Sequence, residues 1–379
     1  MTCKPIFLLL VLALILAIPI FPTAYAASNP NAPTPSINPL TGLPVSDPAR
    51  LALPPALVSI SNFPASTRPQ AGLSTAPIVF ETYIGEGMTR FLAIFYGDYP
   101  TEAANSTGNQ VAADTASVAA IGPIRSGRIS YEEIRKLYNG FLVMAGGYQG
   151  VLQNLRDYTN VYGSDKNDIN SAMIPVAQLE QIAQANSKKL DASALTGMSF
   201  NTQPPANGEA GSVVWLPYSY YNQIFWRYDK ASGAYHRYQD NADAKTFVRA
   251  TDRLNGEPLT FENVVILFAN HEKISNAIID LGLRYIDRAP ALLFRDGQVY
   301  EIFWTTANGE YEKQTGQVRP IRFIDAQGQP FPLKPGQTWV ETVTPATYYF
   351  ETTDSPTYYD LMKNKQPGSG VWAVRFMAP

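Results

Sequence analysis

Residues 77–96 have the sequence PIVFETYIGEGMTRFLAIFY and predict the structural centre of the chain. Two β-rich runs flank Gly85-Glu86-Gly87, and glycine allows the positive φ angles that tight hairpin turns need. Glu81 lies in the middle of the first run, among apolar residues. A carboxylate in such a strand needs a partner when it is buried. The stretch therefore predicts a β-hairpin that carries one charged group requiring a partner.

The secondary-structure patterns around this hairpin differ between the two halves of the chain. Helix and strand patterns mix over residues 47–200, and Ser130-Tyr131-Glu132-Glu133 is a capping box that predicts a helix start. Residues 213–345 are β-rich, with Asp296-Gly297 marking a further hairpin. The predicted fold class is α+β, with mixed sheets and helices in an N-terminal domain and a mainly β C-terminal domain.

The two ends of the chain carry different signals. Residues 1–26 combine a basic start, an apolar core and small residues before Ala27, which predicts a cleaved Sec-type signal peptide and an extracytoplasmic location. The alternative is a membrane anchor, but the apolar run is shorter than the roughly 20 residues that span a bilayer. Residues 27–46 are rich in Pro, Asn, Ser and Thr and predict a disordered linker. Residues 346–379 are interpreted as a C-terminal extension.

Composition excludes several classes of protein. The chain has 379 residues, 45% of them hydrophobic, and a net charge of −3, which gives no general electrostatic reason to bind nucleic acid. Its one cysteine, Cys3, and its two histidines, His236 and His271, exclude disulfide scaffolds and metal sites built from Cys or His clusters. No cofactor is expected. Nucleophile motifs such as G-x-S-x-G are absent from the sequence.

Arginines of the first half form the candidate ligand site. The segment 122–128 contains two arginines and runs into the helix predicted at Ser130, whose N-terminus favours negative charge. Guanidinium groups match carboxylates and phosphates, so the segment predicts an anion site. In the alternative, these arginines pair with Glu132, Glu133 or Glu81. The candidate ligand-binding residues are Arg68, Glu81, Arg90, Arg125, Ser126 and Arg128.

Two further interpretations concern Glu81 and the aromatic residues. Glu81 and Glu86 fit the acid and base of a glycosidase, although any pair of carboxylates fits that description. A structural ion pair is the favoured interpretation for Glu81, and Arg90 across the hairpin is its candidate partner in some strand registers. The aromatic residues between Trp215 and Tyr238 suit stacking on sugar rings, but cross-strand packing is the more common role for aromatics in strands.

Four stretches of the first half form a recognisable set: Asn38-Pro39-Leu40-Thr41-Gly42-Leu43-Pro44, Arg68-Pro69-Gln70-Ala71-Gly72-Leu73, Gly87 to Phe95, and Ile121-Gly122-Pro123-Ile124-Arg125-Ser126. They resemble the YerB-like proteins, which are bacterial envelope lipoproteins with paired N- and C-terminal domains of unknown function (DUF3048). In the second half, the similar stretches are Tyr228 to Tyr235, Val264 to His271, Phe294 to Gly297, and Pro335-Gly336-Gln337-Thr338-Trp339.

The resemblance implies a mixed α and β fold with two sheet layers and one helical layer, a β-β-α arrangement. It implies no activity, cofactor or ligand. The chain lacks the lipid-attachment cysteine of the family and has Met144 where the family pattern has a histidine.

These observations favour an exported envelope protein that binds an anionic polymer or peptide over an enzyme. A protein partner in the envelope is the other kind of partner considered. The alternative function is a cell-wall glycan hydrolase that uses Glu81 or Glu86. A solvent-open cleft with two carboxylates roughly 5–10 Å apart would support the hydrolase.

Overall fold

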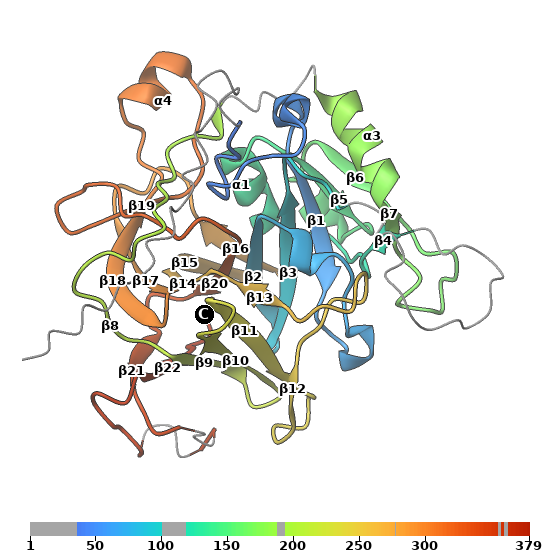
Figure 1. Ribbon diagram of the computed structural model, residues 1–379. Helices are drawn as coiled ribbons and strands as arrows, with labels where there is room; N and C mark the ends of the chain where they lie inside the picture. Colours follow the sequence, from blue (N-terminus) through green and yellow to red (C-terminus); the bar gives the residue numbers. More distant parts are fainter. Residues whose placement is uncertain (1–35, 101–118, 188–193, 277, 355–357, 360–362) are drawn as a thin grey trace, which may run out of the picture. The chain divides into compact units, whose positions relative to one another are not determined.

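The predicted hairpin lies in the middle of a large sheet in the computed structural model, which describes residues 36–100, 119–187, 194–276, 278–354, 358–359 and 363–379 (Figure 1). Glu86 and Gly87 form the turn with positive φ angles of 53° and 75°. Among the described residues this large sheet has eleven strands, in the order β19 (Arg322–Ile324), β18 (Gln298–Thr305), β17 (Ala289–Arg295), β14 (Asn263–Phe268), β20 (Thr338–Val343), β2 (Ile78–Gly85), β3 (Met88–Phe95), β1 (Ala56–Ser61), β5 (Phe141–Met144) and β6 (Tyr158–Asn160), with β8 (Glu209–Ala210) beside β18.

Strands from the two halves of the chain pair directly within this sheet. β2 and β20 run parallel, so that Ile78 pairs with Thr338 and Glu81 pairs with Glu341. On its other side β20 pairs with β14, also in parallel. The two predicted domains therefore share one sheet, and residues 36–379 form one compact unit.

A small sheet faces the large one, and the C-terminal residues belong to it. Its strands are β12 (Phe247–Arg249), β11 (Ala234–Asp240), β10 (Asn222–Asp229), β9 (Val213–Ser219), β22 (Val371–Arg375) and β21 (Tyr348–Glu351), with β13 (Thr260–Phe261) beside β11. β22 pairs with β9 on one side and β21 on the other, and Ala373 and Val374 are 0% exposed. The prediction that residues 346–379 are an appendage is wrong, because their strands complete this sheet.

The core has two layers, one on each face of the large sheet. Val79, Phe91 and Trp339 pack between the sheets against Trp226 and other small-sheet residues. On the opposite face, Phe80 and Leu92 pack in a second cluster with the helix α1 (Ser130–Leu137). Figure 1 shows α1 and the small sheet on opposite sides of the central strands. The α+β class is confirmed, since the described residues are mainly β, with several sheets and few helices.

The remaining elements are short and lie around these layers. They are α2 (Gln149–Leu152), α3 (Val176–Asn186), α4 (Glu310–Thr315), the 3₁₀ helices Pro48–Ala52, Ala65–Thr67 and Leu73–Thr75, and the strand pairs β15 (Asn270–Ser275) with β16 (Ile278–Gly282) and β4 (Ala120–Ile121) with β7 (Ile174–Pro175). None of the helices in the described residues is long and apolar enough to cross a membrane.

Two predictions for the N-terminal region have different outcomes. The predicted signal peptide at residues 1–26 lies outside the described residues, as does the predicted linker up to residue 35. The linker prediction is wrong for its C-terminal part, where Leu40 is 0% exposed. The carboxamide of Asn38 explains this, since its Nδ2 donates to the Tyr96 carbonyl at 2.9 Å and its Oδ1 accepts from the Leu40 amide at 2.9 Å. These bonds fix the segment against the end of β3.

The aromatic residues of β9 to β11 pack across strands. Phe225 stacks on Tyr238, its partner in β11, with ring centroids 4.6 Å apart and planes 8° apart. Trp226 and Tyr235 are buried between the sheets. The structure thus places these residues in cross-strand and core contacts, the more ordinary of the two interpretations considered for them.

Candidate functional site

The carboxyl ends of β1, β5 and β6 meet at one edge of the large sheet, because these neighbouring strands run parallel. The loop that leads to Arg128 crosses this edge between β1 and β5. The Arg125 amide donates to the Ser59 carbonyl at 2.9 Å, and the Arg125 carbonyl accepts from the Ala145 amide at 2.9 Å. Ligands of α/β sheets commonly bind beyond the carboxyl ends of parallel strands. The loop is therefore held where a ligand would approach.

Gly127 lets this loop lie close against the end of β5. Its amide donates to the Gly146 carbonyl at 2.9 Å. A Cβ at Gly127 would lie 2.3 Å from Met144 Sδ and 2.8 Å from Leu155 Cδ1. Met144, at the position where the related pattern has a histidine, thus packs beneath the loop and is 0% exposed.

The helix α1 begins differently from the prediction. The predicted cap, Ser130, is the first residue of the helix, whereas Ile129 occupies the N-cap position without a side-chain hydrogen bond. The amides of Tyr131 and Glu132 donate to the carbonyls of Arg128 and Ile129, each at 3.1 Å. The capping-box prediction is wrong, because the loop backbone satisfies these donors. The anion site then rests on the arginines more than on the helix N-terminus.

Three arginines converge at this edge, and we call Arg90, Arg125 and Arg128 the arginine cluster. Arg90 is 7% exposed, and its Nη1 donates to the Ser126 carbonyl at 3.1 Å. Arg125 is half-buried, with its Nε 3.3 Å from Ser61 Oγ. Arg128 is also half-buried. The Nε groups of Arg90 and Arg128 are buried without a hydrogen-bond partner. These two Nε atoms are closed to solvent, so a ligand would contact the cluster through the outer atoms of the half-buried Arg125 and Arg128 side chains.

The three guanidinium groups influence one another electrostatically. Burial lowers the pKa of Arg90 to about 9; Tyr131 opposes this shift, and the charges of Arg128 and Arg125 contribute to it. Burial and then the charge of Arg128 lower the pKa of Arg125. Like charges this close disfavour one another's charged form. A bound anion would relieve this repulsion while all three groups stay protonated.

Nearby carboxylates bind other cations. Glu132 pairs with Arg135 at 2.8 Å, and Glu133 pairs with Arg284 at 2.7 Å. Glu81 pairs with Arg237 at 2.8 Å. Within the described residues, no carboxylate forms a salt bridge with the arginine cluster. The alternative in which these arginines are neutralised by Glu132, Glu133 or Glu81 is not what the structure shows.

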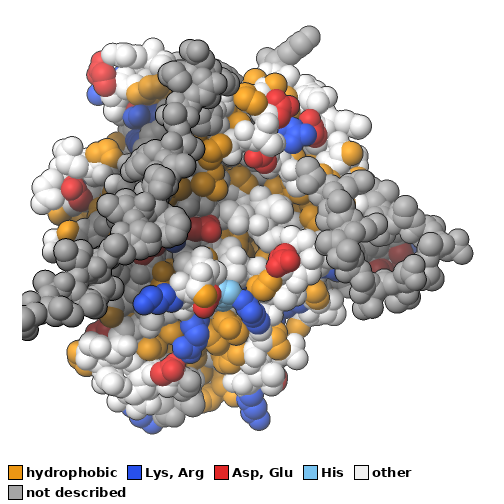
Figure 2. All heavy atoms as spheres, viewed as in Figure 1, with side chains coloured by type: hydrophobic (Ala, Val, Ile, Leu, Met, Phe, Trp, Pro, Cys, Tyr) orange, Lys and Arg blue, Asp and Glu red, His pale blue; other side chains and the backbone are white. Residues whose placement is uncertain are grey.

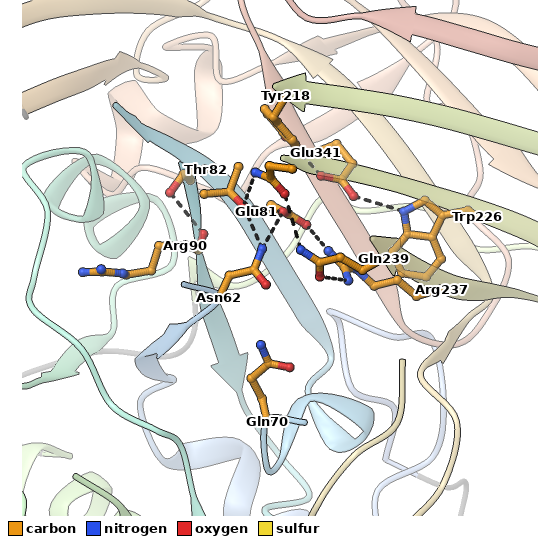
Figure 3. A network of polar contacts seen from close by, with 12 residues as sticks. Asn62, Gln70, Glu81, Thr82, Arg90, Tyr218, Trp226, Arg237, Gln239 and Glu341 are labelled. Atoms are coloured by element: carbon orange, nitrogen blue, oxygen red, sulfur yellow. Dashed lines mark hydrogen bonds and ion pairs between the residues drawn. The ribbon is translucent and has the colours of Figure 1, made fainter. Parts of the chain in front are cut away.

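Glu81 lies in a buried network between the two sheets and apart from the arginine cluster (Figure 3). It is 0% exposed, and its carboxylate accepts hydrogen bonds from Thr89 at 2.6 Å and Asn62 at 3.3 Å. Glu81 thus forms a structural ion pair, but its partner is Arg237 and not Arg90. Figure 3 shows the Arg90 side chain extending away from Glu81. The strand register explains this, since Arg90 pairs with Thr82.

A second glutamate, which the sequence analysis did not single out, completes this network. Glu341 is 0% exposed and accepts from Trp226 Nε1 at 3.0 Å and from the Tyr218 hydroxyl at 3.1 Å. Burial, followed by the charge of Glu81, raises the pKa of Glu341 well above its ordinary value. A carboxylate opposite Glu81 could be recognised only after β2 and β20 are known to pair. The network joins the two halves of the chain.

The other predicted site residues have clear positions. Arg68 donates from Nε to the Asn62 carbonyl at 3.1 Å and from Nη1 to the Asp240 carbonyl at 2.7 Å. It thus ties the loop after β1 to β11. Ser126 contributes its backbone carbonyl to Arg90. Glu86 is exposed in the hairpin turn, whereas Glu81 is fully buried, so these two carboxylates do not line one solvent-open cleft.

The described residues contain no group of three or more His, Cys, Asp and Glu side chains placed to hold a metal ion. His271 is 7% exposed, and its Nδ1 contacts the Ala269 carbonyl at 2.8 Å. Burial lowers its pKa to about 4. This is the hydrogen-bonded, structural position expected for a lone histidine at a strand end.

Comparisons with known proteins agree with this architecture. Residues 40–194 match the family described as "Protein of unknown function (DUF3048) N-terminal domain", and residues 214–340 match the corresponding C-terminal domain. A relative named "Putative lipoprotein YerB", from Bacillus subtilis (strain 168), is 27% identical over 323 residues, covering 80% of this chain and 85% of the relative. The crystal structure of YerB protein from Bacillus subtilis has a TM-score of 0.62 at 26% identity, covering 81% of this chain and 96% of that chain.

Proposed function

The chain belongs to the DUF3048 family, and from this premise we propose that it is an exported, non-catalytic envelope protein that binds an anionic ligand through the arginine cluster. The membership confirms the resemblance found in the sequence. The relative's name, "Putative lipoprotein YerB", supports a location outside the cytoplasm, as does the signal-peptide pattern of residues 1–26.

One observation carries the proposal. Arg90, Arg125 and Arg128 lie close together at the carboxyl edge of parallel strands, and no carboxylate of the described residues pairs with them. A buried cation without a counter-charge is costly, and it is retained where a ligand supplies that charge. Arginine forms paired hydrogen bonds with carboxylates and phosphates. The proposed ligand is therefore an envelope polymer or peptide that carries such groups.

Co-sedimentation of residues 27–379 with purified cell-wall sacculi tests the proposal. We expect binding that weakens as salt is raised, because exposed charge interactions are screened. Arg125→Ala/Arg128→Ala should weaken binding by about tenfold or more, since hydrogen bonds to charged groups contribute about 1.5–3 kcal/mol each. The supernatant should contain no released sugar. Released fragments would contradict the non-catalytic assignment.

A matched control removes two exposed arginines elsewhere. Figure 2 shows Lys and Arg side chains beside hydrophobic ones in the lower part of the view, over the small sheet. Arg227 and Arg249 are exposed on strands of that sheet. Arg227→Ala/Arg249→Ala changes the net charge by the same amount and should leave binding within about twofold of wild type. Equal losses of binding in the two double variants would show that net charge alone drives the binding. That result would overturn the assignment of the site to the arginine cluster.

A further inference from the structure

Two exposed tyrosines follow β5 and β6, the strands next to the loop that carries Arg125 and Arg128. Tyr148 is 69% exposed and Tyr162 is 70% exposed. Tyr148 follows the glycine pair at the end of β5, and Tyr162 follows the end of β6. Single exposed aromatic residues are ordinary on protein surfaces. These two lie beyond the carboxyl ends of the same parallel strands that carry the arginine loop.

Gly146 links the tyrosines to the arginine loop. The Gly146 carbonyl accepts from the Gly127 amide at 2.9 Å, and the Gly146 amide donates to Asn160 Oδ1 at 3.0 Å. A Cβ added to Gly146 would lie 3.5 Å from the Tyr162 ring. The Tyr162 ring thus lies against Gly146, and Gly146 is hydrogen-bonded to Gly127 of the arginine loop. Tyr162 is thus separated from the arginine loop by Gly146 alone, and Tyr148 lies two positions after Gly146 in the sequence.

Tyrosine rings together with the arginine cluster suit a ligand that has more than a negative charge. A tyrosine presents an apolar ring face and a hydroxyl at its edge, which suits ligands with both apolar and polar surface. A sugar ring has that character, since its C–H groups pack on an aromatic face while its hydroxyls form hydrogen bonds. The arginine cluster adds the requirement for a negative group attached to the ring.

We infer that the arginine cluster binds a saccharide that carries a phosphate or carboxylate group, with Tyr148 and Tyr162 contacting its sugar ring. This inference rests on the proposed function and names the class of its ligand. Arg90, Arg125 and Arg128 hold the anionic group, and the tyrosines distinguish an anionic sugar from a free anion. Neutral sugars lack the group that the cluster requires.

Calorimetric titration of residues 27–379 with four probes tests the inference: inorganic phosphate, glucose 1-phosphate, glucuronic acid and glucose. We expect glucose 1-phosphate to bind about five- to tenfold more tightly than inorganic phosphate, and glucose to bind undetectably. A stronger response to glucuronic acid than to glucose 1-phosphate would identify a carboxylate as the native group. The opposite order would identify a phosphate, and either order supports the inference.

Two double variants separate the ring contribution from the anion contribution. Tyr148→Ala/Tyr162→Ala should abolish the preference for glucose 1-phosphate and leave the affinity for inorganic phosphate unchanged. Arg125→Ala/Arg128→Ala should weaken both. Tyr221→Ala/Tyr285→Ala is the matched control, because both residues are 58% exposed and lie on other turns; it should retain the preference.

The failures of the two proposals differ. Equal affinity of the wild-type protein for glucose 1-phosphate and inorganic phosphate would overturn the saccharide inference and leave the anion site standing. A preference that survives in the tyrosine double variant would also overturn it. Absence of binding to every anionic probe would overturn the anion site as well.

Discussion

The guanidinium of Arg90 is held by the backbone carbonyl of Ser126, with 3.1 Å between Nη1 and O, instead of by a carboxylate. A carbonyl accepts a hydrogen bond but carries no net charge. Arg90 therefore remains a buried cation beside Arg125 and Arg128. This arrangement lowers the stability of the unliganded protein and makes the cluster responsive to anions, a trade-off that is common at functional sites.

Removing charge from the cluster should stabilise the unliganded protein. For Arg125→Gln/Arg128→Gln we expect the free energy of unfolding to rise by about 0.5–1 kcal/mol at low ionic strength, because repulsion of Arg90 is relieved. The gain should shrink as salt is added. Urea unfolding measures both effects. Arg284→Gln is the control and should lower stability, since Arg284 pairs with Glu133 at 2.7 Å. A loss of stability in the double variant would show that these arginines have structural partners.

The ion pair of Glu81 and Arg237 should be essential for folding. Both residues are at most 1% exposed, so Arg237→Met would leave the Glu81 carboxylate buried without a cation. The expected loss is about 3–5 kcal/mol. Arg227→Met on β10, an exposed position, should change stability by less than about 0.5 kcal/mol. The urea unfolding midpoints of the two variants measure these changes in stability. Equal losses in both variants would contradict the structural role of the pair.

The raised pKa of Glu341 predicts a specific pH dependence. In the folded protein Glu341 keeps its proton above the ordinary carboxyl pKa of about 4.3, whereas the unfolded chain loses it there. The folded state then binds more protons, so this group's contribution to stability falls as pH rises from that value. Glu341→Gln removes the effect. The stability of the variant relative to wild type should therefore increase from pH 5 to pH 8, and a flat or decreasing difference in urea titrations would refute the assignment.

The C-terminal strands should be required for the fold. Val371, Trp372, Ala373 and Val374 of β22 are at most 7% exposed between β9 and β21. Burial of a large apolar side chain contributes about 1.5–3 kcal/mol, and several lost together approach the whole stability of a domain, about 5–15 kcal/mol. Residues 27–345 should thus show no cooperative thermal transition, in contrast to residues 27–379. Equal transitions for the two lengths would mean that these strands are dispensable.

Local signals in the sequence predicted the hairpins well. Two predicted turns, Gly85-Glu86-Gly87 and Asp296-Gly297, each connect adjacent antiparallel strands. Their residues have positive φ angles, which glycine adopts readily. The sequence of residues 150–158 is typical of a helix, but α2 ends at Leu152 and the chain then turns to form β6. Short periodic runs of this kind depend on tertiary contacts for their final conformation.

Contacts between distant segments could not be predicted from one sequence. The partner of Glu81 is Arg237, which lies 156 positions away and becomes a neighbour only when the two sheets pack. The role of β22 depends likewise on its parallel pairing with β9. For the site, the sequence identified Arg90, Arg125, Ser126 and Arg128 by residue type. Their lack of carboxylate partners became visible only when Glu132 and Glu133 were seen to bind Arg135 and Arg284.

Anion-dependent thermal stabilisation tests the central claim most directly. An anion that binds the folded state and not the unfolded chain stabilises the fold by RT ln(1 + [L]/Kd), so the melting temperature rises with anion concentration. Inorganic phosphate should raise the melting temperature of residues 27–379 above that in chloride of equal ionic strength, and it should leave Arg125→Ala/Arg128→Ala unchanged. Equal shifts in the wild-type protein and the variant, or no shift in either, would contradict an anion site at the arginine cluster.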